Sequence, residues 1–347
     1  MTASASLADV RIDVLGDGDA GDRLAEAVRA GLCRAPKEVP PKLLYDERGS
    51  ELFDRITELP EYYPTRCERA ILNRHAPEIV AATEAEELLE LGSGVASKTC
   101  ALLYAMAGAG TLRRYLPLDV DRSVVERSGE ELTALYPGLA VHGLVGDFGR
   151  DLSGVPEPDG WRLVAFLGGT IGNLYAPERV GLLRRLAALM RERDRLLLGA
   201  DLVKDESRLL AAYDDAQGVT RAFTANVLRV IDRELGADFD QDGFEPFARW
   251  DGDAQRIELG LRARWDQRVR IAALEGLEVV FAAGEELRTE VSTKFTRGGL
   301  ERELAEAGFE IERFRCDKQG LFSVTLARPV AFGSSPGGGS HDGSTTG

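Results

Sequence analysis

The sequence has few of the residues that build metal sites and disulfide frameworks. Its 347 residues include only four cysteines and three histidines. The cysteines, which are Cys33, Cys67, Cys100 and Cys316, form no C-x-x-C pair. Structural zinc sites and disulfide frameworks need such residues in clusters. We therefore expect neither, and no bound metal.

The chain is also short of positive charge and of long apolar runs. Its formal net charge is −15, whereas nucleic acids and anionic membranes attract proteins through a basic face. We therefore expect no nucleic acid and no membrane as partner. No apolar run is long enough to span a bilayer, and no basic-plus-apolar signal opens the chain. These features predict a cytoplasmic protein, and we expect a monomer that acts on a small molecule.

A glycine-rich loop within residues 88–99 is the most informative stretch. An apolar run, a turn and a helical pattern predict strand, loop and helix, and Gly92 and Gly94 would let the backbone approach a ligand. A dinucleotide fingerprint needs a third glycine where Ser97 stands, so that interpretation weakens. Glu90 instead favours the sulfonium cation of S-adenosylmethionine, which a carboxylate attracts. A purely structural loop is the alternative.

The next two predicted strands also end in candidate ligand residues. Asp119 stands at about the spacing at which an acid binds ribose hydroxyls in doubly wound folds. A helix cap is the alternative for Asp119, but Asp121 is the better cap candidate. The third predicted strand leads to Asp147 and Phe148, which offer the acceptor and the apolar face that an adenine needs. A surface turn is the alternative there.

A fourth predicted strand, residues 163–167, runs into a turn that carries Asn173. Ligands of doubly wound sheets bind outside the carboxyl ends of the strands, so Asn173 lies where a substrate would meet the cofactor. A fifth strand is predicted over 196–201, with helical patterns between the strands. Together they predict an α/β fold with a doubly wound sheet.

The pattern changes after about residue 203. Helices are predicted over 205–236, then a strand over 257–265 whose antiparallel partner contains Val269 and Ile271. Further on, Glu290 and Ser292 would share one face of a strand, so one ligand could contact both. A solvated outer face explains the pattern equally well.

Prolines and aromatic residues gather in the N-terminal stretch 40–66. They suggest a cap that folds over something, although composition alone favours simple core packing for Tyr45 and Tyr62. The predicted organisation is a flexible N-terminus (1–20), a core with an N-terminal cap region (21–203 and 296–330), an inserted domain (204–295) and a disordered tail (331–347).

Four motifs together resemble one family closely. They are the proline-flanked stretch 40–66, Glu90–Gly94, Phe166–Asn173 and Thr289–Ser292, and the family is the L-histidine Nα-methyltransferases of ergothioneine biosynthesis. The resemblance runs from about residue 20 to residue 329. It implies a Rossmann-like methyltransferase sheet of seven strands with an added α+β substrate-binding domain. It also implies trimethylation of L-histidine to hercynine, with S-adenosylmethionine as co-substrate.

The resemblance further implies roles for individual residues. It assigns S-adenosylmethionine to Gly92, Lys98, Asp119, Asp147 and Phe148. It assigns the histidine carboxylate to Tyr62 and Tyr213, the α-amino group to Asn173, and the imidazole to Glu290 with Ser292. Tyr45 is placed near the amine, where Asn173 and a water bound to Tyr45 would orient the reacting nitrogen.

Two positions depart from the family, and two rival functions remain. Leu259 stands where the family's enzyme has a methionine beside the imidazole, and Gly169 where it has a serine. Leucine keeps the volume of methionine, so the pocket should survive, but the selectivity for the ring is affected. The rivals are a methyltransferase of another amino acid or biogenic amine, and a non-catalytic protein that binds a nucleoside or a partner.

Overall fold

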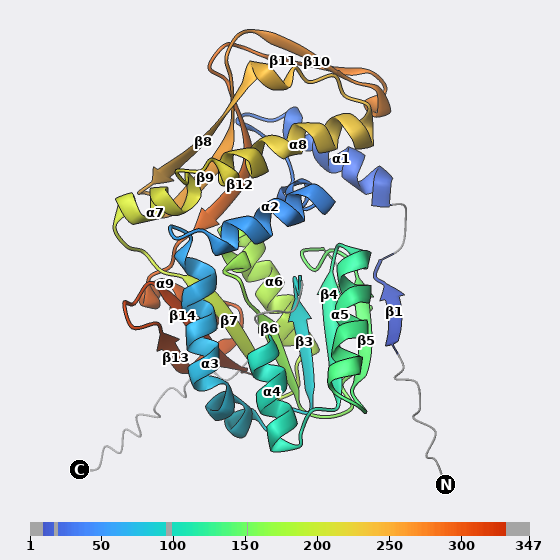
Figure 1. Cartoon of the computed structure of the whole chain (residues 1–347), viewed down its shortest axis with the longest axis vertical. Helices are drawn as coiled ribbons and strands as arrows, with labels where there is room; N and C mark the ends of the chain where they lie inside the picture. The colour runs from blue at the N-terminus through green and yellow to red at the C-terminus, as the bar shows by residue number, and fades with distance from the viewer. Residues whose placement is uncertain (1–9, 17–19, 95–98, 151, 331–347) are drawn as a thin grey trace, which may run out of the picture.

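The computed structural model describes residues 10–16, 20–94, 99–150 and 152–330. Lys98 lies outside these ranges, as do much of the expected flexible N-terminus and the expected tail. One large sheet occupies the lower half of Figure 1. Its eight strands, in spatial order, are β1 (Val10–Val14), β5 (Ala140–Val145), β4 (Arg114–Asp119), β3 (Glu87–Leu91), β6 (Arg162–Phe166), β7 (Arg195–Asp201), β14 (Phe322–Pro329) and β13 (Phe309–Cys316).

The sheet is parallel from β1 to β7, and β14 runs antiparallel to β7 and to β13. Its central strands β3 and β6 are buried at every residue, which explains their nearly continuous apolar runs. The predicted doubly wound α/β sheet is confirmed. The sequence analysis missed β13, whose apolar residues alternate with charged ones at the edge of the sheet.

The edge strand β1 lies in the segment that we assigned to the flexible N-terminus. Val10 to Val14 pair in parallel with Val141 to Val145 of β5, so the assignment was wrong for these five residues. Five alternating residues are a weak local signal. The partner strand lies about 130 positions along the chain, where no local pattern can indicate it.

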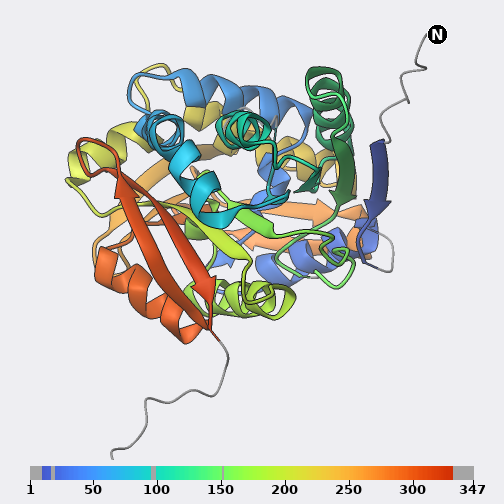
Figure 2. The ribbon, with the colours of Figure 1, turned by 90° about the horizontal axis from the view of Figure 1, so that it is seen from below.

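Helices cover both faces of the sheet (Figure 2). One face packs against α3 (Tyr63–Thr83), α4 (Cys100–Ala109) and α5 (Arg122–Leu135), and the other against α6 (Ala176–Leu189) and α9 (Arg297–Glu306). Asp121 caps α5, because its carboxylate accepts from the backbone N–H of Ser123, as predicted. Within the described ranges, no helix is long and apolar enough to cross a membrane.

The upper half of Figure 1 is a second, α+β part. Its four-stranded sheet has the order β2 (Lys37–Glu38), β12 (Glu286–Thr293), β9 (Arg256–Ala263) and β8 (Phe244–Asp251), beside a hairpin of β10 (Gln267–Ile271) and β11 (Leu277–Phe281). The helices α7 (Glu206–Tyr213) and α8 (Val219–Leu235) follow β7 in the chain. The expected partner of β9 was β10, which was wrong: β9 pairs with β8 and β12.

The N-terminal cap region packs on this second part. Its elements are α1 (Ala20–Leu32), β2, the 3-10 helix η1 (Pro41–Leu44) and α2 (Glu47–Glu58). Leu32, Leu44 and Ile56 share one apolar core with α8 and β9, and β2 pairs with β12. Two stretches far apart in the sequence therefore build the α+β part, whereas the sequence analysis placed the cap region with the large sheet.

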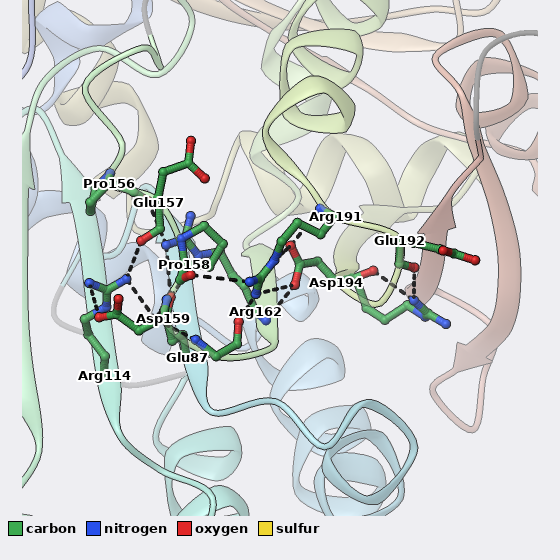
Figure 3. Close-up of polar contacts among 12 residues, drawn as sticks. Glu87, Arg114, Pro156, Glu157, Pro158, Asp159, Arg162, Arg191, Glu192 and Asp194 are labelled. Atoms are coloured by element: carbon green, nitrogen blue, oxygen red, sulfur yellow. Dashed lines mark hydrogen bonds and ion pairs between the residues drawn. The ribbon is translucent and has the colours of Figure 1, made fainter.

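A buried ion-pair network ties together the amino ends of three strands (Figure 3). Glu87 at the start of β3 contacts Arg162 at the start of β6 (2.9 Å) and Arg114 at the start of β4 (2.8 Å). The backbone N–H of Asp159 also donates to Glu87, at 2.6 Å. A buried carboxylate needs such partners. The network is structural and leaves the opposite, carboxyl ends of the strands free for ligands.

Candidate active site

A cavity of about 1600 Å³ opens where the carboxyl ends of β3 to β6 face the α+β part. Residues of both parts line it. Seven of the predicted site residues are in its wall: Tyr45, Gly92, Asp119, Asp147, Phe148, Asn173 and Glu290. The fold therefore brings four of the residues predicted for the co-substrate, all except Lys98 outside the described ranges, and several of those predicted for the substrate to one space.

The edge of the cavity that is predicted to bind the co-substrate is built from loops after three parallel strands. Gly92 has a φ of +67°, and Phe148 Cε1 lies 3.7 Å from the position that a Cβ would take. A side chain there would be strained and would stand against the Phe148 ring. Phe148 in turn packs edge-on against Phe166, with ring centroids 5.2 Å apart. The loop thus keeps its backbone open beside an apolar face.

Both acidic candidates are held by backbone N–H groups. Asp119 accepts from Gly94 at 2.9 Å and from Asp121 at 3.1 Å, and Asp147 accepts from Gly149 at 3.0 Å. Burial raises the pKa of Asp119, and these N–H donors oppose the rise. A carboxylate oxygen has two lone pairs, so each acid keeps acceptor capacity for a ligand hydroxyl or amino group.

Glu90, predicted to attract the sulfonium, is only 3% exposed. Its carboxylate accepts from the Tyr115 hydroxyl at 2.5 Å and from the Thr99 hydroxyl. Thr99 is the residue before α4. The Glu90 carboxylate therefore lies in the cavity wall beside the glycine-rich loop. Its hydrogen bond with Thr99 also holds the end of the loop that leads into α4.

Asn173 and Glu290 meet across the two parts of the molecule. Asn173 ends the short helix η2 (Thr170–Asn173), which follows β6, and its Nδ2 donates to Glu290 Oε1 at 2.7 Å. The buried carboxylate of Glu68 accepts from the Gly168 backbone N–H at 2.8 Å and so fixes the turn that carries Asn173. Among the described residues no donor to the amide oxygen of Asn173 is found, so this oxygen can accept from a ligand.

Three predicted substrate residues lie close to Glu290 but do not line the cavity. Tyr62, Tyr213 and Ser292 are not among the lining residues. The Tyr213 hydroxyl lies 2.9 Å from Ser292 Oγ, and the Tyr62 and Tyr213 rings pack edge-on at 6.1 Å. Ser292 is two positions after Glu290 on β12, so both share a face of the strand as predicted. These three residues therefore extend the predicted substrate site from Glu290 toward the interior of the protein.

Leu259 and Tyr45 complete the surroundings. Leu259 on β9 is the ladder partner of Glu290 on β12, so it lies beside the carboxylate. The Tyr45 ring packs edge-on against Phe53 at 5.5 Å and Phe223 at 5.4 Å, which makes Tyr45 part of the apolar core as well as of the cavity wall. Tyr45 therefore packs in the core, as composition alone favoured, and its place in the cavity wall is compatible with the predicted role near the amine.

Comparison with known proteins decides the family. Residues 24–329 match the model of the S-adenosylmethionine-dependent, histidine-specific methyltransferases. The chain belongs to this family. The resemblance inferred from the four motifs is thereby confirmed, and the chain is an S-adenosylmethionine-dependent N-methyltransferase with a Rossmann-like core.

Individual relatives agree with this assignment. The methyltransferase is 53% identical over 312 residues to Histidine N-alpha-methyltransferase of Mycolicibacterium smegmatis, covering 89% of this chain and 97% of the relative. It is 50% identical over 310 residues to Histidine N-alpha-methyltransferase of Mycobacterium tuberculosis, covering 89% and 96%. It is also 36% identical over 205 residues to Ergothioneine biosynthesis protein 1 of Neurospora crassa, covering 58% of this chain and 23% of the relative.

The carboxyl group of Glu290 in this methyltransferase is electrostatically unusual. Burial raises its pKa from 4.5 to about 7, while the positive charge of Lys294 and the hydrogen bond from Asn173 oppose the rise. Near neutral pH the group therefore exchanges a proton easily. A carboxyl group with this pKa is matched to imidazole, whose ordinary pKa is about 6.5.

The ligand-free methyltransferase should lose stability as pH rises through the window set by Glu290. The pKa is 4.5 in the unfolded chain and about 7 in the folded one, so the folded state binds more protons between these values. The free energy of unfolding therefore falls with rising pH, by about 2 to 3 kcal/mol. Glu290→Gln removes this dependence. Urea unfolding of both proteins near pH 5 and near pH 8 measures it, and parallel pH dependences would contradict it.

Two residues that organise the methyltransferase site, Lys294 and Glu68, were not predicted from the sequence. Lys294 continues the alternation of Glu290 and Ser292 by two more positions, so the signal was present but was not followed. Glu68 is a carboxylate one turn from Pro64, Ile71 and Leu72 on a buried helix face. A buried acid on such a face needs hydrogen-bond donors. This pattern alone would have identified Glu68 as a residue that organises polar groups around it.

Proposed function

We propose that this methyltransferase transfers three methyl groups from S-adenosylmethionine to the α-amino nitrogen of L-histidine and forms hercynine, a step of ergothioneine biosynthesis. The observation that carries the proposal is the Asn173–Glu290 hydrogen bond of 2.7 Å in the same cavity as Asp119 and Phe148. It supports a site in which the amine and imidazole of one small molecule face the methyl donor.

The reaction needs alignment more than acid or base catalysis. In each transfer the nitrogen lone pair attacks the methyl carbon in line, the carbon–sulfur bond breaks, and its electron pair stays on sulfur. Starting from the ammonium form, three transfers release three protons and three molecules of S-adenosylhomocysteine. Each attack requires a neutral nitrogen, and solvent takes the protons. The protein contributes orientation and exclusion of water.

In this proposal the side chains have distinct tasks. Asn173 accepts an N–H of the amine through its amide oxygen, and a water on Tyr45 orients the lone pair. Tyr62 and Tyr213 hold the carboxylate. Glu290 and Ser292 hold the imidazole, and Leu259 packs beside it in place of methionine. Gly92, Asp119, Asp147 and Phe148 hold the methyl donor.

Asp119→Ala should weaken S-adenosylmethionine binding by about 10-fold, because a charged acceptor for the ribose hydroxyls is lost. Asp121→Ala is the matched control, two residues along. Asp121 caps α5 through Ser123, so its loss should cost about 1 kcal/mol of stability with affinity nearly unchanged. Isothermal titration calorimetry measures both. Equal losses of affinity would argue against a ribose contact at Asp119.

The function is tested by incubating the protein with S-adenosylmethionine and all common amino acids pooled, and following masses over time. A gain of three methyl groups on histidine alone is expected. The same gain on another amino acid would keep the co-substrate site but reassign the pocket around Glu290 and Leu259. No gain at all, despite tight binding of S-adenosylmethionine, would favour a non-catalytic binding protein.

A further inference from the structure

Lys294 is a lysine with its side chain fully buried directly behind the substrate residues. The side chain is 0% exposed. Its Nζ lies 2.7 Å from the Tyr213 hydroxyl, 2.7 Å from Ser292 Oγ and 3.0 Å from Asp201 Oδ2. An ammonium group has three protons, and these three oxygens satisfy all of them. Burial lowers the pKa of Lys294, and the charge of Asp201 opposes that shift.

The position of Nζ limits what the two hydroxyls can do. Together they carry two protons and four lone pairs. Lys294 occupies one lone pair on each oxygen, and their mutual contact of 2.9 Å uses one proton and one further lone pair. One proton and one lone pair remain for a ligand. They are always on different residues, because the hydroxyl that donates across the pair keeps the free lone pair.

We propose that Lys294 is a positioning residue that makes Tyr213 a hydrogen-bond donor and Ser292 an acceptor toward the substrate. This inference rests on the proposed function, in which Tyr213 binds the histidine carboxylate and Ser292 the imidazole. A carboxylate only accepts, so Tyr213 donates to it and Ser292 donates to Tyr213. The oxygen of Ser292 then has only its free lone pair for the ring. The pocket therefore selects a ring that carries an N–H at this point.

The other ring nitrogen of the substrate would face Glu290. A neutral imidazole has one N–H and one acceptor nitrogen, and its N–H is directed to Ser292. A proton must then lie between the acceptor nitrogen and the Glu290 carboxyl group. Burial raises the pKa of Glu290 to about 7, close to that of imidazole, so either partner can carry this proton. A ring without an N–H group cannot donate to Ser292.

A second lysine in the same cluster provides a matched control. Lys204 Nζ lies 2.5 Å from Asp201 Oδ1 and 2.7 Å from the Tyr63 hydroxyl, and its side chain is 7% exposed. In the described part of the chain, Lys204 donates to Tyr63, Asp201 and the Leu202 carbonyl, and not to Tyr213 or Ser292. Both lysines share one carboxylate, but only Lys294 donates to the hydroxyl pair.

The test compares Lys294→Met with Lys204→Met, using histidine and 3-(thiazol-4-yl)alanine as substrates. The thiazole has the size of imidazole and an acceptor nitrogen but no N–H. In Lys294→Met the hydroxyls are free to reorient and Ser292 can donate to the thiazole. The ratio of kcat/KM for histidine to that for the thiazole should fall at least ~10-fold, mostly through a higher KM for histidine. In Lys204→Met the ratio should stay at the wild-type value.

A fall of the ratio in both variants, or in neither, would overturn the inference, since a purely structural lysine lowers both activities together. Binding of S-adenosylmethionine, measured by calorimetry, shows whether each variant folds. If Lys294→Met does not fold, nitrogen-15 NMR of labelled histidine bound to the wild-type protein with S-adenosylhomocysteine decides. One ring nitrogen should be a fixed N–H, and exchange between two tautomers would overturn the inference.

The outcomes also separate this inference from the proposed function. A wild-type protein that does not methylate histidine overturns both. A wild-type protein that methylates histidine, beside a Lys294→Met variant with the wild-type preference for histidine over the thiazole, overturns only the role of Lys294.

Discussion

Asn173→Ala should lower kcat for histidine by about 100-fold while the dissociation constant of S-adenosylmethionine changes less than about 2-fold. The variant loses the amide oxygen that we assign to the amine, and a reacting nitrogen misplaced by about 1 Å can cost a factor of this size. The Asn173 side chain also donates to Glu290 at 2.7 Å, so KM for histidine should rise, but less than kcat falls. Steady-state kinetics and calorimetry measure the three quantities.

Asn226→Ala is the matched control for that experiment. Asn226 is also a buried asparagine that donates to a carboxylate, Asp46, at 2.7 Å. Its loss removes the same kind of hydrogen bond away from the reacting nitrogen, so stability should fall by about 1 to 2 kcal/mol with kcat nearly unchanged. If Asn173→Ala lowered kcat and co-substrate affinity equally, Asn173 would not have the proposed role.

Glu290→Ala should lower kcat/KM for histidine by roughly 100-fold, because a buried, charge-assisted hydrogen bond to the imidazole is lost. Amino acids with apolar rings should lose much less, since Leu259 opposite Glu290 still offers them an apolar contact. The selectivity for histidine therefore falls with the activity. Competition assays with pairs of amino acids, analysed by mass spectrometry, measure the change directly.

Glu286→Ala on the same strand controls for effects on β12. Glu286 pairs with Arg249 at 2.6 Å and with Arg262 at 2.9 Å, and both arginines are exposed at the surface. Exposed pairs of this kind contribute at most about 1 kcal/mol, so neither stability nor selectivity should change much. A similar loss of selectivity in both variants would show that the strand, rather than the Glu290 carboxylate, decides the preference.

The sheet and its ligand edge could be predicted well from the sequence. Asp119, Asp147 and Asn173 each follow an apolar run, and the carboxyl ends of parallel strands meet at one edge. The order along the chain therefore placed them together without knowledge of any contact. The pattern of β12 likewise placed Glu290 and Ser292 on one face, because side chains alternate along a strand.

The arrangement around the substrate residues could not be predicted in this way. The strand β10 was expected beside β9, yet β9 pairs with β8 and β12. The apolar alternation of a strand shows which side is buried but not which strand lies beside it. The two-residue strand β2 and the cap helices were placed with the wrong part for the same reason. β2 pairs with β12 about 250 positions away, and α2 lies against α8, where Asn226 contacts Asp46 across 180 positions.

The sequence by itself determined the fold class, the family and the residues at the strand ends, because local periodicity and short motifs encode them. The tertiary structure decided which of these residues touch. The Asn173–Glu290 bond joins positions 117 residues apart, and Lys294 reaches Tyr213 across 81. Such contacts depend on how two separate cores pack together, and the burial that packing produces sets the pKa of Glu290. No local pattern carries that information.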